Sequence, residues 1–266
     1  MEDGPVLIVT GGGTGIGAAV ARSAARSGWQ VAACGRREAP LALVAREPGV
    51  EAIVTDAADP AGVDMLVRTV LDRHGRIDGV VANAGVLREG AVADTSDDDW
   101  AETLRVNLTG PFLLARATLP HLAAAGGALV GVSSIAGLQP PMAAAAYATS
   151  KAGLAMLVRS IARDYGGQGV RANVVCPGWV RTEMADAEMS EFGSTIGAGV
   201  EAAYAEVTTL VPQRRPGRAE EVAAAVLWLL GPESSYVNGA VLTVDGGTTT
   251  VDAGTVPLDF SVVPRG

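Results

Sequence analysis

Short runs of apolar and β-branched residues alternate with longer amphipathic stretches along the whole chain. The runs, bounded by Gly, Asp or Pro, predict strands at Val6–Thr10, 29–34, 52–55, Gly79–Ala82, 128–133, 171–176 and Val241–Val244. Apolar residues recur at helical spacing over 16–27, Pro60–His74, 99–125, 147–165 and 218–230. Because the strands lack polar alternation, both of their faces are expected to be buried. This pattern predicts an α/β fold with a doubly wound parallel sheet.

The chain is expected to form one domain over 1–266, since no repeat, low-complexity tract or linker divides it. The segment 182–216 shows no clear pattern and is predicted to be irregular. Ligands bind beyond the carboxyl ends of the strands in such sheets, so this segment is a candidate substrate lid. A contact between subunits is an equally weighted alternative. The proline-interrupted tail 248–266 is expected to fray or to form an arm between subunits.

Composition excludes several classes of function. The net charge of −9 argues against nucleic acid or an anionic membrane surface as a partner. Cys34 and Cys176 lie far apart and outside any Cys-x-x-Cys pattern, so neither a disulfide framework nor a zinc site is predicted. No basic leader precedes the first strand, and no apolar run approaches the length of a membrane span. We therefore expect a cytoplasmic protein.

A glycine-rich turn follows the first strand and opens the first helix. Glycines allow a tight turn and close approach of the backbone, and a helix N-terminus offers free N–H groups to a pyrophosphate. The spacing differs from the usual G-x-G-x-x-G, and a compact strand–helix connection would look similar. The residues assigned here to a dinucleotide site are Gly11, Thr14, Gly15, Ile16 and Gly17.

The end of the second strand favours a phosphorylated dinucleotide. Gly35 stands where NAD-binding units usually carry an acidic residue against the ribose 2′-hydroxyl, and Arg36 and Arg37 follow it. A guanidinium fork suits a phosphate, so the sequence favours NADP(H) over NAD(H), with Glu38 as an alternative partner for a ribose. At the end of the third strand, Asp56 is placed to accept a hydrogen bond from an adenine amino group.

Tyr147 and Lys151 form the chemical centre of the predicted site. Four residues apart on a helix, they present a phenol and an ammonium on the same face. A nearby cation favours the phenolate, so the pKa of Tyr147 is expected to fall below its ordinary value of about 10. Ser134, at the end of the preceding strand, adds a hydroxyl. Tyr-x-x-x-Lys alone is common, and two solvated side chains on a helix are its plain alternative.

Taken together and in this order, the motifs resemble those of the classical short-chain dehydrogenase/reductase family over essentially the whole chain. Further matching motifs are Asn83-Ala84-Gly85, Asn107 in Val-Asn-Leu-Thr-Gly, and Pro177-Gly178 with Thr182. Ser134 precedes Tyr147 by thirteen residues, which is the family's usual interval. Ala82 departs from the pattern, because the family more often has a second asparagine before Asn83. That departure puts the hydrogen bonding of this loop in doubt but removes no catalytic group.

The resemblance implies a role for each of these residues. Tyr147 would act as general acid in ketone reduction and as base in alcohol oxidation. Lys151 would lower the tyrosine pKa and hold the nicotinamide ribose, and Ser134 would hydrogen-bond the reacting oxygen. Asn107 would hold a water that relays protons through Lys151. The resemblance places the cofactor against Asn83, Ala84, Gly85, Pro177, Gly178 and Thr182, and it also implies a homotetramer.

Other classes of function are less well supported. A serine hydrolase would need a Gly-x-Ser-x-Gly elbow, which the sequence lacks. The run Asp97-Asp98-Asp99 is expected to begin a helix, and no metal site is predicted. A catalytically silent nucleotide sensor on the same fold stays an alternative, although all four catalytic positions carry competent side chains.

The substrate class follows from charge. The turns at 123–127 and 166–169 lack basic residues that would attract an acidic carrier protein, and the chain is itself acidic. We therefore expect a small-molecule ketone or secondary alcohol as substrate. A 3-oxoacyl-(acyl-carrier-protein) or polyketide ketoreductase is the alternative.

Overall fold

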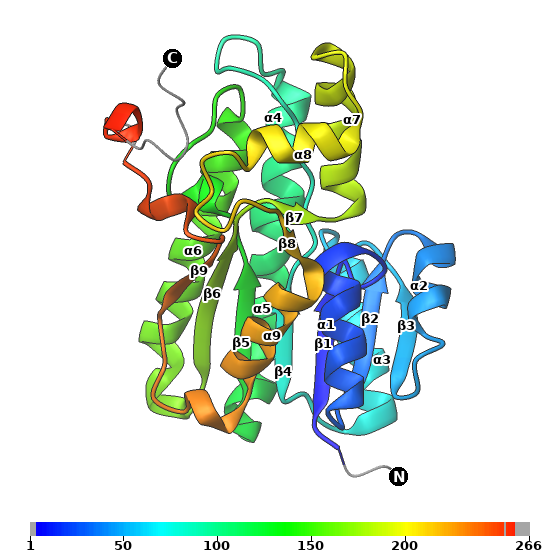
Figure 1. The fold of residues 1–266 in the computed structure, drawn as a ribbon. Helices are drawn as coiled ribbons and strands as arrows, with labels where there is room; N and C mark the ends of the chain where they lie inside the picture. Colours follow the sequence, from blue (N-terminus) through cyan, green and yellow to red (C-terminus); the bar gives the residue numbers. More distant parts are fainter. Residues whose placement is uncertain (1–3, 253, 259–266) are drawn as a thin grey trace.

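The computed structural model describes residues 4–252 and 254–258, and their main feature is a parallel sheet covered by helices on both faces (Figure 1). Within these residues the sheet has seven strands in the order β3-β2-β1-β4-β5-β6-β9. The strands are β1 Val6–Thr10, β2 Gln30–Gly35, β3 Val50–Val54, β4 Gly79–Ala82, β5 Ala128–Val132, β6 Arg171–Pro177 and β9 Val241–Val244. The predicted doubly wound parallel sheet is confirmed.

Two hydrophobic clusters explain why the strands are apolar on both faces. In β1, Val6 and Ile8 face one cluster, while Leu7 and Val9 face the other. The first cluster includes residues of α3 Pro60–His74, α5 Gly110–Ala125 and α6 Ala145–Tyr165. The second includes residues of α1 Gly15–Arg26, α2 Glu38–Val44 and α9 Ala219–Leu230. In the described part of the chain, none of the helices combines the length and apolarity needed to span a bilayer.

The segment predicted as one helix over 99–125 is divided in the structure. It begins as α4 Asp97–Leu104, widens to a π-helical turn at Arg105–Thr109, and continues as α5. Pro111 has no N–H to donate to the carbonyl four residues earlier, which favours a wider turn at this point. The acidic run does begin a helix, because Asp99 N donates to Ser96 Oγ at 3.0 Å.

The prediction that 182–216 is irregular is wrong. This segment contains α7 Glu183–Thr195 and α8 Val200–Val207, and the short strands β7 Val180–Arg181 and β8 Gly217–Arg218 pair at its base. Thr182 Oγ1 accepts from Ala185 N at 3.2 Å and so caps α7. Tyr204 is buried against Met189 and donates to Asp186 Oδ1 at 2.8 Å. These contacts stabilise two helices that bury few apolar side chains and so show little hydrophobic periodicity in the sequence.

Other differences concern short elements. The helix α2 spans only Glu38–Val44 and was not predicted. The tail contains turns at Thr248–Thr250 and Val256–Leu258, while residues 253 and 259–266 of the predicted tail lie outside the described residues. In Figure 1, α7 and α8 lie above the carboxyl ends of the strands. This position fits either alternative for the 182–216 segment, a substrate lid or a subunit contact.

Candidate active site

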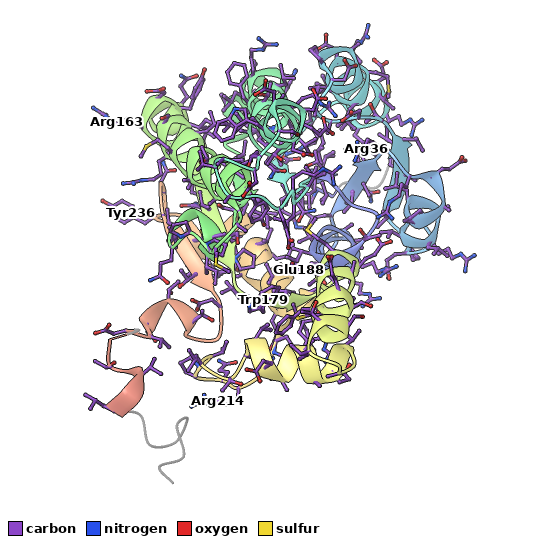
Figure 2. All side chains as sticks on the ribbon, turned by 90° about the horizontal axis from the view of Figure 1, so that it is seen from above. Arg36, Arg163, Trp179, Glu188, Arg214 and Tyr236 are labelled. Carbon is purple, nitrogen blue, oxygen red and sulfur yellow. The ribbon has the colours of Figure 1, made fainter. Side chains whose placement is uncertain are left out.

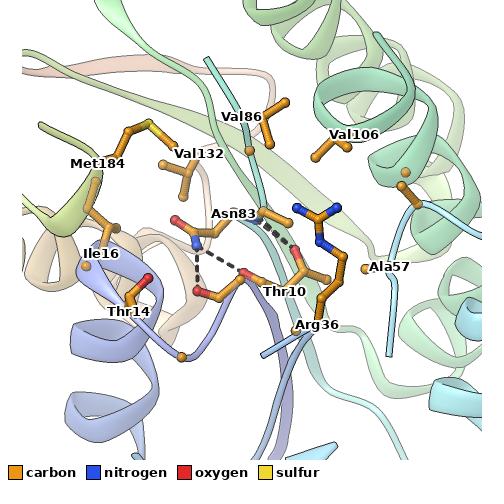
Figure 3. Close-up of a pocket in the computed structure, with 18 of the residues that line it drawn as sticks. Thr10, Thr14, Ile16, Arg36, Ala57, Asn83, Val86, Val106, Val132 and Met184 are labelled. Carbon is orange, nitrogen blue, oxygen red and sulfur yellow. Dashed lines mark hydrogen bonds between the residues drawn. The ribbon is translucent and has the colours of Figure 1, made fainter. Parts of the chain in front are cut away.

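A cleft of about 300 Å³ opens at the carboxyl ends of the strands, between elements that follow β1, β2, β4 and β5 (Figure 3). It lies where the strand order reverses between β1 and β4, which is the usual ligand position in such sheets. The predicted residues that line it are Gly11, Thr14, Gly15, Ile16, Arg36, Arg37, Asp56, Asn83, Ala84, Gly85, Tyr147, Lys151 and Thr182. Those outside its lining are Gly17, Asn107, Ser134, Pro177 and Gly178.

The glycine-rich turn needs glycine at two positions for different reasons. Gly11 has φ 63°, in the left-handed region, and a Cβ there would lie 2.9 Å from Asn83 Nδ2. At Gly17, a Cβ would lie only 2.2 Å from the carbonyl oxygen of Gly11. Gly17 therefore allows α1 to pack against the turn and does not itself face the cleft.

Asn83 and Thr10 hold the turn in shape. Asn83 Nδ2 donates to the carbonyls of Thr10 at 3.0 Å and Gly11 at 3.3 Å (Figure 3). Thr10 Oγ1 accepts from the backbone N–H groups of Asn83 at 3.0 Å and Ala84 at 3.1 Å. The loop is thus well bonded with alanine at position 82. These hydrogen bonds to the Thr10 hydroxyl were not predicted from the sequence.

The charged side chains at the far side of the cleft are already engaged with one another. Arg36 Nη1 lies 3.8 Å from Glu102 Oε1. Asp56 accepts from Ala58 N at 2.9 Å and from Arg105 Nη1 at 3.0 Å. Viewed from above, Arg36 lies toward the side of the molecule that holds β2 and β3 (Figure 2). The Asp56 carboxylate thus already has two partners within the chain. The predicted hydrogen bond between Asp56 and an adenine amino group stays a prediction.

Tyr147, Lys151 and Ser134 come together at the other end of the cleft. Tyr147 lies in the first turn of α6 and hydrogen-bonds with Ser134, which follows β5. Lys151 Nζ lies 5.7 Å from the centroid of the Tyr147 ring and donates to the carbonyl of Val132 at 3.0 Å. The phenol therefore connects Ser134 to the cleft, although Ser134 does not line it.

Burial controls the acidity of both groups. Burial lowers the pKa of Lys151 to about 8. Burial raises the pKa of Tyr147, and the hydrogen bond with Ser134 only partly offsets this increase. The Tyr-x-x-x-Lys spacing predicted that Lys151 lowers the pKa of Tyr147. The direction differs here because the phenol is desolvated and the nearest bond of the ammonium is to the Val132 carbonyl.

Asn107 lies in the π-helical turn, which packs against α6. Its side chain accepts from Val86 N at 2.8 Å and donates to Val86 O at 2.9 Å and to Ser150 Oγ at 3.0 Å. Ser150 in turn donates to the carbonyl of Tyr147 at 2.7 Å. A Cβ on Gly85 would lie 3.4 Å from both Asn107 Oδ1 and Lys151 Nζ, so these two atoms flank Gly85. The predicted water relay stays a prediction.

The comparisons with known proteins agree with this geometry. A family model described as enoyl-(acyl carrier protein) reductase matches residues 11–249. The chain belongs to the short-chain dehydrogenase/reductase family. It is similar to the protein MoaE of Klebsiella aerogenes, with 41% identity over 90% of this chain and 93% of MoaE. It is also similar to meso-2,3-butanediol dehydrogenase of Serratia marcescens, with 34% identity over 91% of this chain and 94% of that enzyme.

A solved structure shows the same likeness in three dimensions. A variant of actinorhodin polyketide ketoreductase, crystallised with NADPH, matches with a TM-score of 0.89 and 31% identity over 94% of this chain and 99% of that one. This short-chain dehydrogenase/reductase is therefore an oxidoreductase of the family that uses a nicotinamide cofactor and acts on C=O or CH–OH groups. Its cleft suits a dinucleotide, because the first N–H groups of α1 open onto it at Gly15 and Ile16.

The remaining predicted residues divide into two groups. Gly178 N donates to Val244 O at 3.1 Å, and Pro177 pairs with Val244, so both residues join β6 to β9 and do not line the cleft. Thr182 packs on the glycine-rich turn, since a Cβ on Gly15 would lie 3.0 Å from its methyl group.

Among residues 4–252 and 254–258, no group of three His, Cys, Asp or Glu side chains is arranged to hold a metal ion.

Two residues of α7 were missed by the sequence analysis. Glu183 lines the cleft and bonds to Arg37, which lies 146 residues away in sequence. Glu188 is partly buried and lies near the middle of the molecule when it is viewed from above (Figure 2). The negative charge of Glu188 raises the pKa of Tyr147. For Glu183 the available signal was its position just after Thr182, and an acidic residue at a helix start is usually explained by the helix dipole. Glu188 lies inside α7, and no signal in the sequence pointed to it.

Proposed function

We propose that this protein is an NADP(H)-dependent oxidoreductase that interconverts a ketone and a secondary alcohol on a small-molecule substrate. The observation that carries the proposal is the Tyr147 phenol, hydrogen-bonded to Ser134, with Lys151 one helical turn away on the wall of the cleft. The glycine-rich turn opens onto the same cleft. An acid group and a dinucleotide-shaped site thus share one space.

The proposed mechanism assigns each group to an atom of the substrate. A dinucleotide held by the glycine-rich turn and the cleft would supply the hydride for the carbonyl carbon. Tyr147 donates its proton to the carbonyl oxygen, and the Ser134 hydroxyl holds the same oxygen as charge develops on it. The Lys151 ammonium stabilises the phenolate left on Tyr147. In alcohol oxidation Tyr147 accepts the proton instead, and Asn107 holds the water that connects Lys151 with solvent.

The preference for NADP(H) is supported by charge at the end of β2. Gly35 carries no carboxylate that would repel a 2′-phosphate, and Arg36 and Arg37 line the cleft beside it. The related actinorhodin ketoreductase was solved with NADPH. Glu38 is exposed and does not line the cleft, so it gives little support to NAD(H) as the cofactor.

The relatives support two substrate classes. Similarity to the butanediol dehydrogenase supports a small diol or ketone as the substrate of this protein. Similarity to the polyketide ketoreductase supports a carrier-linked acyl chain as its substrate. The net charge of −9 disfavours an acidic carrier protein and so favours the small molecule. A homotetramer in the cytoplasm also remains part of the proposal. The homotetramer is supported by the position of β9 at the sheet edge and by the exposed Trp228 on the neighbouring α9.

Turnover with paired cofactors and paired substrates tests the proposal. Nicotinamide absorbance is followed with NADPH or NADH, and with a panel of free ketones or a 3-oxoacyl thioester on a carrier protein. We expect the highest kcat/KM with NADPH and a free ketone. Faster reaction of the carrier-linked thioester would instead support the acyl reductase. Binding of NADPH without turnover of any substrate would identify a sensor and contradict the proposal.

A further inference from the structure

An ion pair between Arg37 and Glu183 joins the two sides of the cleft. Arg37 Nη1 donates to Glu183 Oε1 at 2.8 Å, and Nη2 donates to Oε2 at 2.7 Å. Nη2 also lies 3.4 Å from Thr14 Oγ1 in the glycine-rich turn. Arg37 precedes α2 and Glu183 begins α7, so the pair ties the β2–α2 turn to the 182–216 segment. All three residues line the cleft.

The two arginines that follow β2 are therefore not equivalent. Among the residues that the structure describes, the ion pair of Arg36 is a long contact with Glu102, at 3.8 Å. Arg37 presents both arms of its guanidinium to one carboxylate, which is the arrangement that a phosphate would also use. A phosphate beside Arg37 must displace the Glu183 carboxylate or lie next to its negative charge. Either case weakens binding of the phosphorylated dinucleotide only.

We propose that Glu183 is a specificity-determining residue whose carboxylate competes with the 2′-phosphate of the dinucleotide for Arg37. The competition narrows the preference for NADP(H) over NAD(H). It also makes the contact between α7 and the β2–α2 turn depend on the cofactor, since the phosphate releases α7 from Arg37 and an unphosphorylated dinucleotide does not. The inference rests on the proposed function only in placing the dinucleotide in this cleft.

The Arg37–Glu183 ion pair is weak enough for a phosphate to compete with the carboxylate. Both side chains are more than half exposed, at 59% and 58%, and an exposed ion pair contributes little to stability. The doubly charged phosphate can therefore replace the carboxylate. Loss of the carboxylate should strengthen phosphate binding by about two- to fivefold, which corresponds to the usual range for exposed pairs.

Binding measurements with four nucleotides test this competition without turnover. NADP⁺, NAD⁺, 2′-AMP and 5′-AMP are titrated against the wild type and Glu183→Gln. We expect Glu183→Gln to bind NADP⁺ and 2′-AMP about two- to fivefold more tightly. Binding of NAD⁺ and 5′-AMP should not change. Arg37→Ala should weaken NADP⁺ and 2′-AMP, and adding Glu183→Gln to Arg37→Ala should give no further gain.

Glu201→Gln is the matched control. Glu201 forms a similar two-bond pair with Arg181 in the same 182–216 segment, but it does not line the cleft. Its substitution should leave all four affinities unchanged. Equal changes for NADP⁺ and NAD⁺ in Glu183→Gln, weaker NADP⁺ binding, or no change at all would overturn the inference.

The two proposals can fail separately. If the wild type binds NAD⁺ more tightly than NADP⁺, the proposed cofactor preference is wrong, yet a selective gain for NADP⁺ in Glu183→Gln still supports the competition. If NADP⁺ is preferred but Glu183→Gln has no selective effect, only the inference fails. A protein that binds none of the four nucleotides contradicts both.

Discussion

Tyr147→Phe is expected to lower kcat by about 10²–10⁴-fold, the usual contribution of a positioned general acid. The substitution removes the phenolic oxygen and keeps the ring that packs in the first turn of α6. The only side-chain bond that it breaks among those described is the one with Ser134. Steady-state kinetics with NADPH and a reactive ketone measure the loss, and a nucleotide titration should show NADPH binding within about twofold of the wild type.

Tyr165→Phe supplies the control for this experiment. Tyr165 ends the same helix and does not line the cleft, so its variant should retain full turnover. A Tyr147→Phe protein with undiminished kcat would contradict the assigned role. A fall in NADPH affinity that accounts for the whole loss would assign Tyr147 to binding and not to proton transfer.

Lys151→Met is expected to abolish measurable turnover and, at pH 7, to raise the free energy of unfolding. Lys151 is buried, with 4% of the residue's surface exposed, and this burial lowers the pKa of its ammonium from 10.5 to about 8. Holding a desolvated charge in the folded protein costs stability, which a methionine of similar length avoids. The variant loses the cation that stabilises the Tyr147 phenolate, so stability and activity change in opposite directions.

The difference in stability between the wild type and Lys151→Met should depend on pH. The unfolded state binds the Lys151 proton more tightly than the folded state does, because the folded pKa is depressed. The wild type therefore gains stability relative to Lys151→Met as pH rises from about 8 to 10.5, and the difference is constant below that window. Denaturant unfolding of both proteins across this range measures the effect. A difference that does not change with pH would show that Lys151 is not desolvated.

Much of the fold was predictable because its determinants are local in sequence. Strands buried on both faces give continuous apolar runs, and β1 shows the reason, since alternate residues enter two separate clusters. The pairing of Tyr147 with Lys151 was predictable for a similar reason, as residues four apart share one helical face. Family membership followed from the order of several such motifs.

What escaped prediction depends on contacts between distant segments. The helices α7 and α8 are stabilised by Tyr204 against Asp186 and by the small cluster around Met189, neither of which has a periodic signal. The Arg37–Glu183 pair joins positions 146 residues apart. The direction of the Tyr147 pKa depends on how far the folded chain desolvates the phenol, which a motif does not encode.

Transfer of deuterium from the 4-position of labelled NADPH tests the central claim most directly. The purified protein is incubated with a ketone and each of the two 4-deuterated NADPH epimers, and the product is examined by mass spectrometry and NMR. Hydride transfer to a carbonyl with proton donation by Tyr147 predicts one deuterium on the carbinol carbon from one epimer, and unlabelled solvent hydrogen on the oxygen. Alcohol formed without deuterium from either epimer, or deuterium found at any other carbon, would contradict the account.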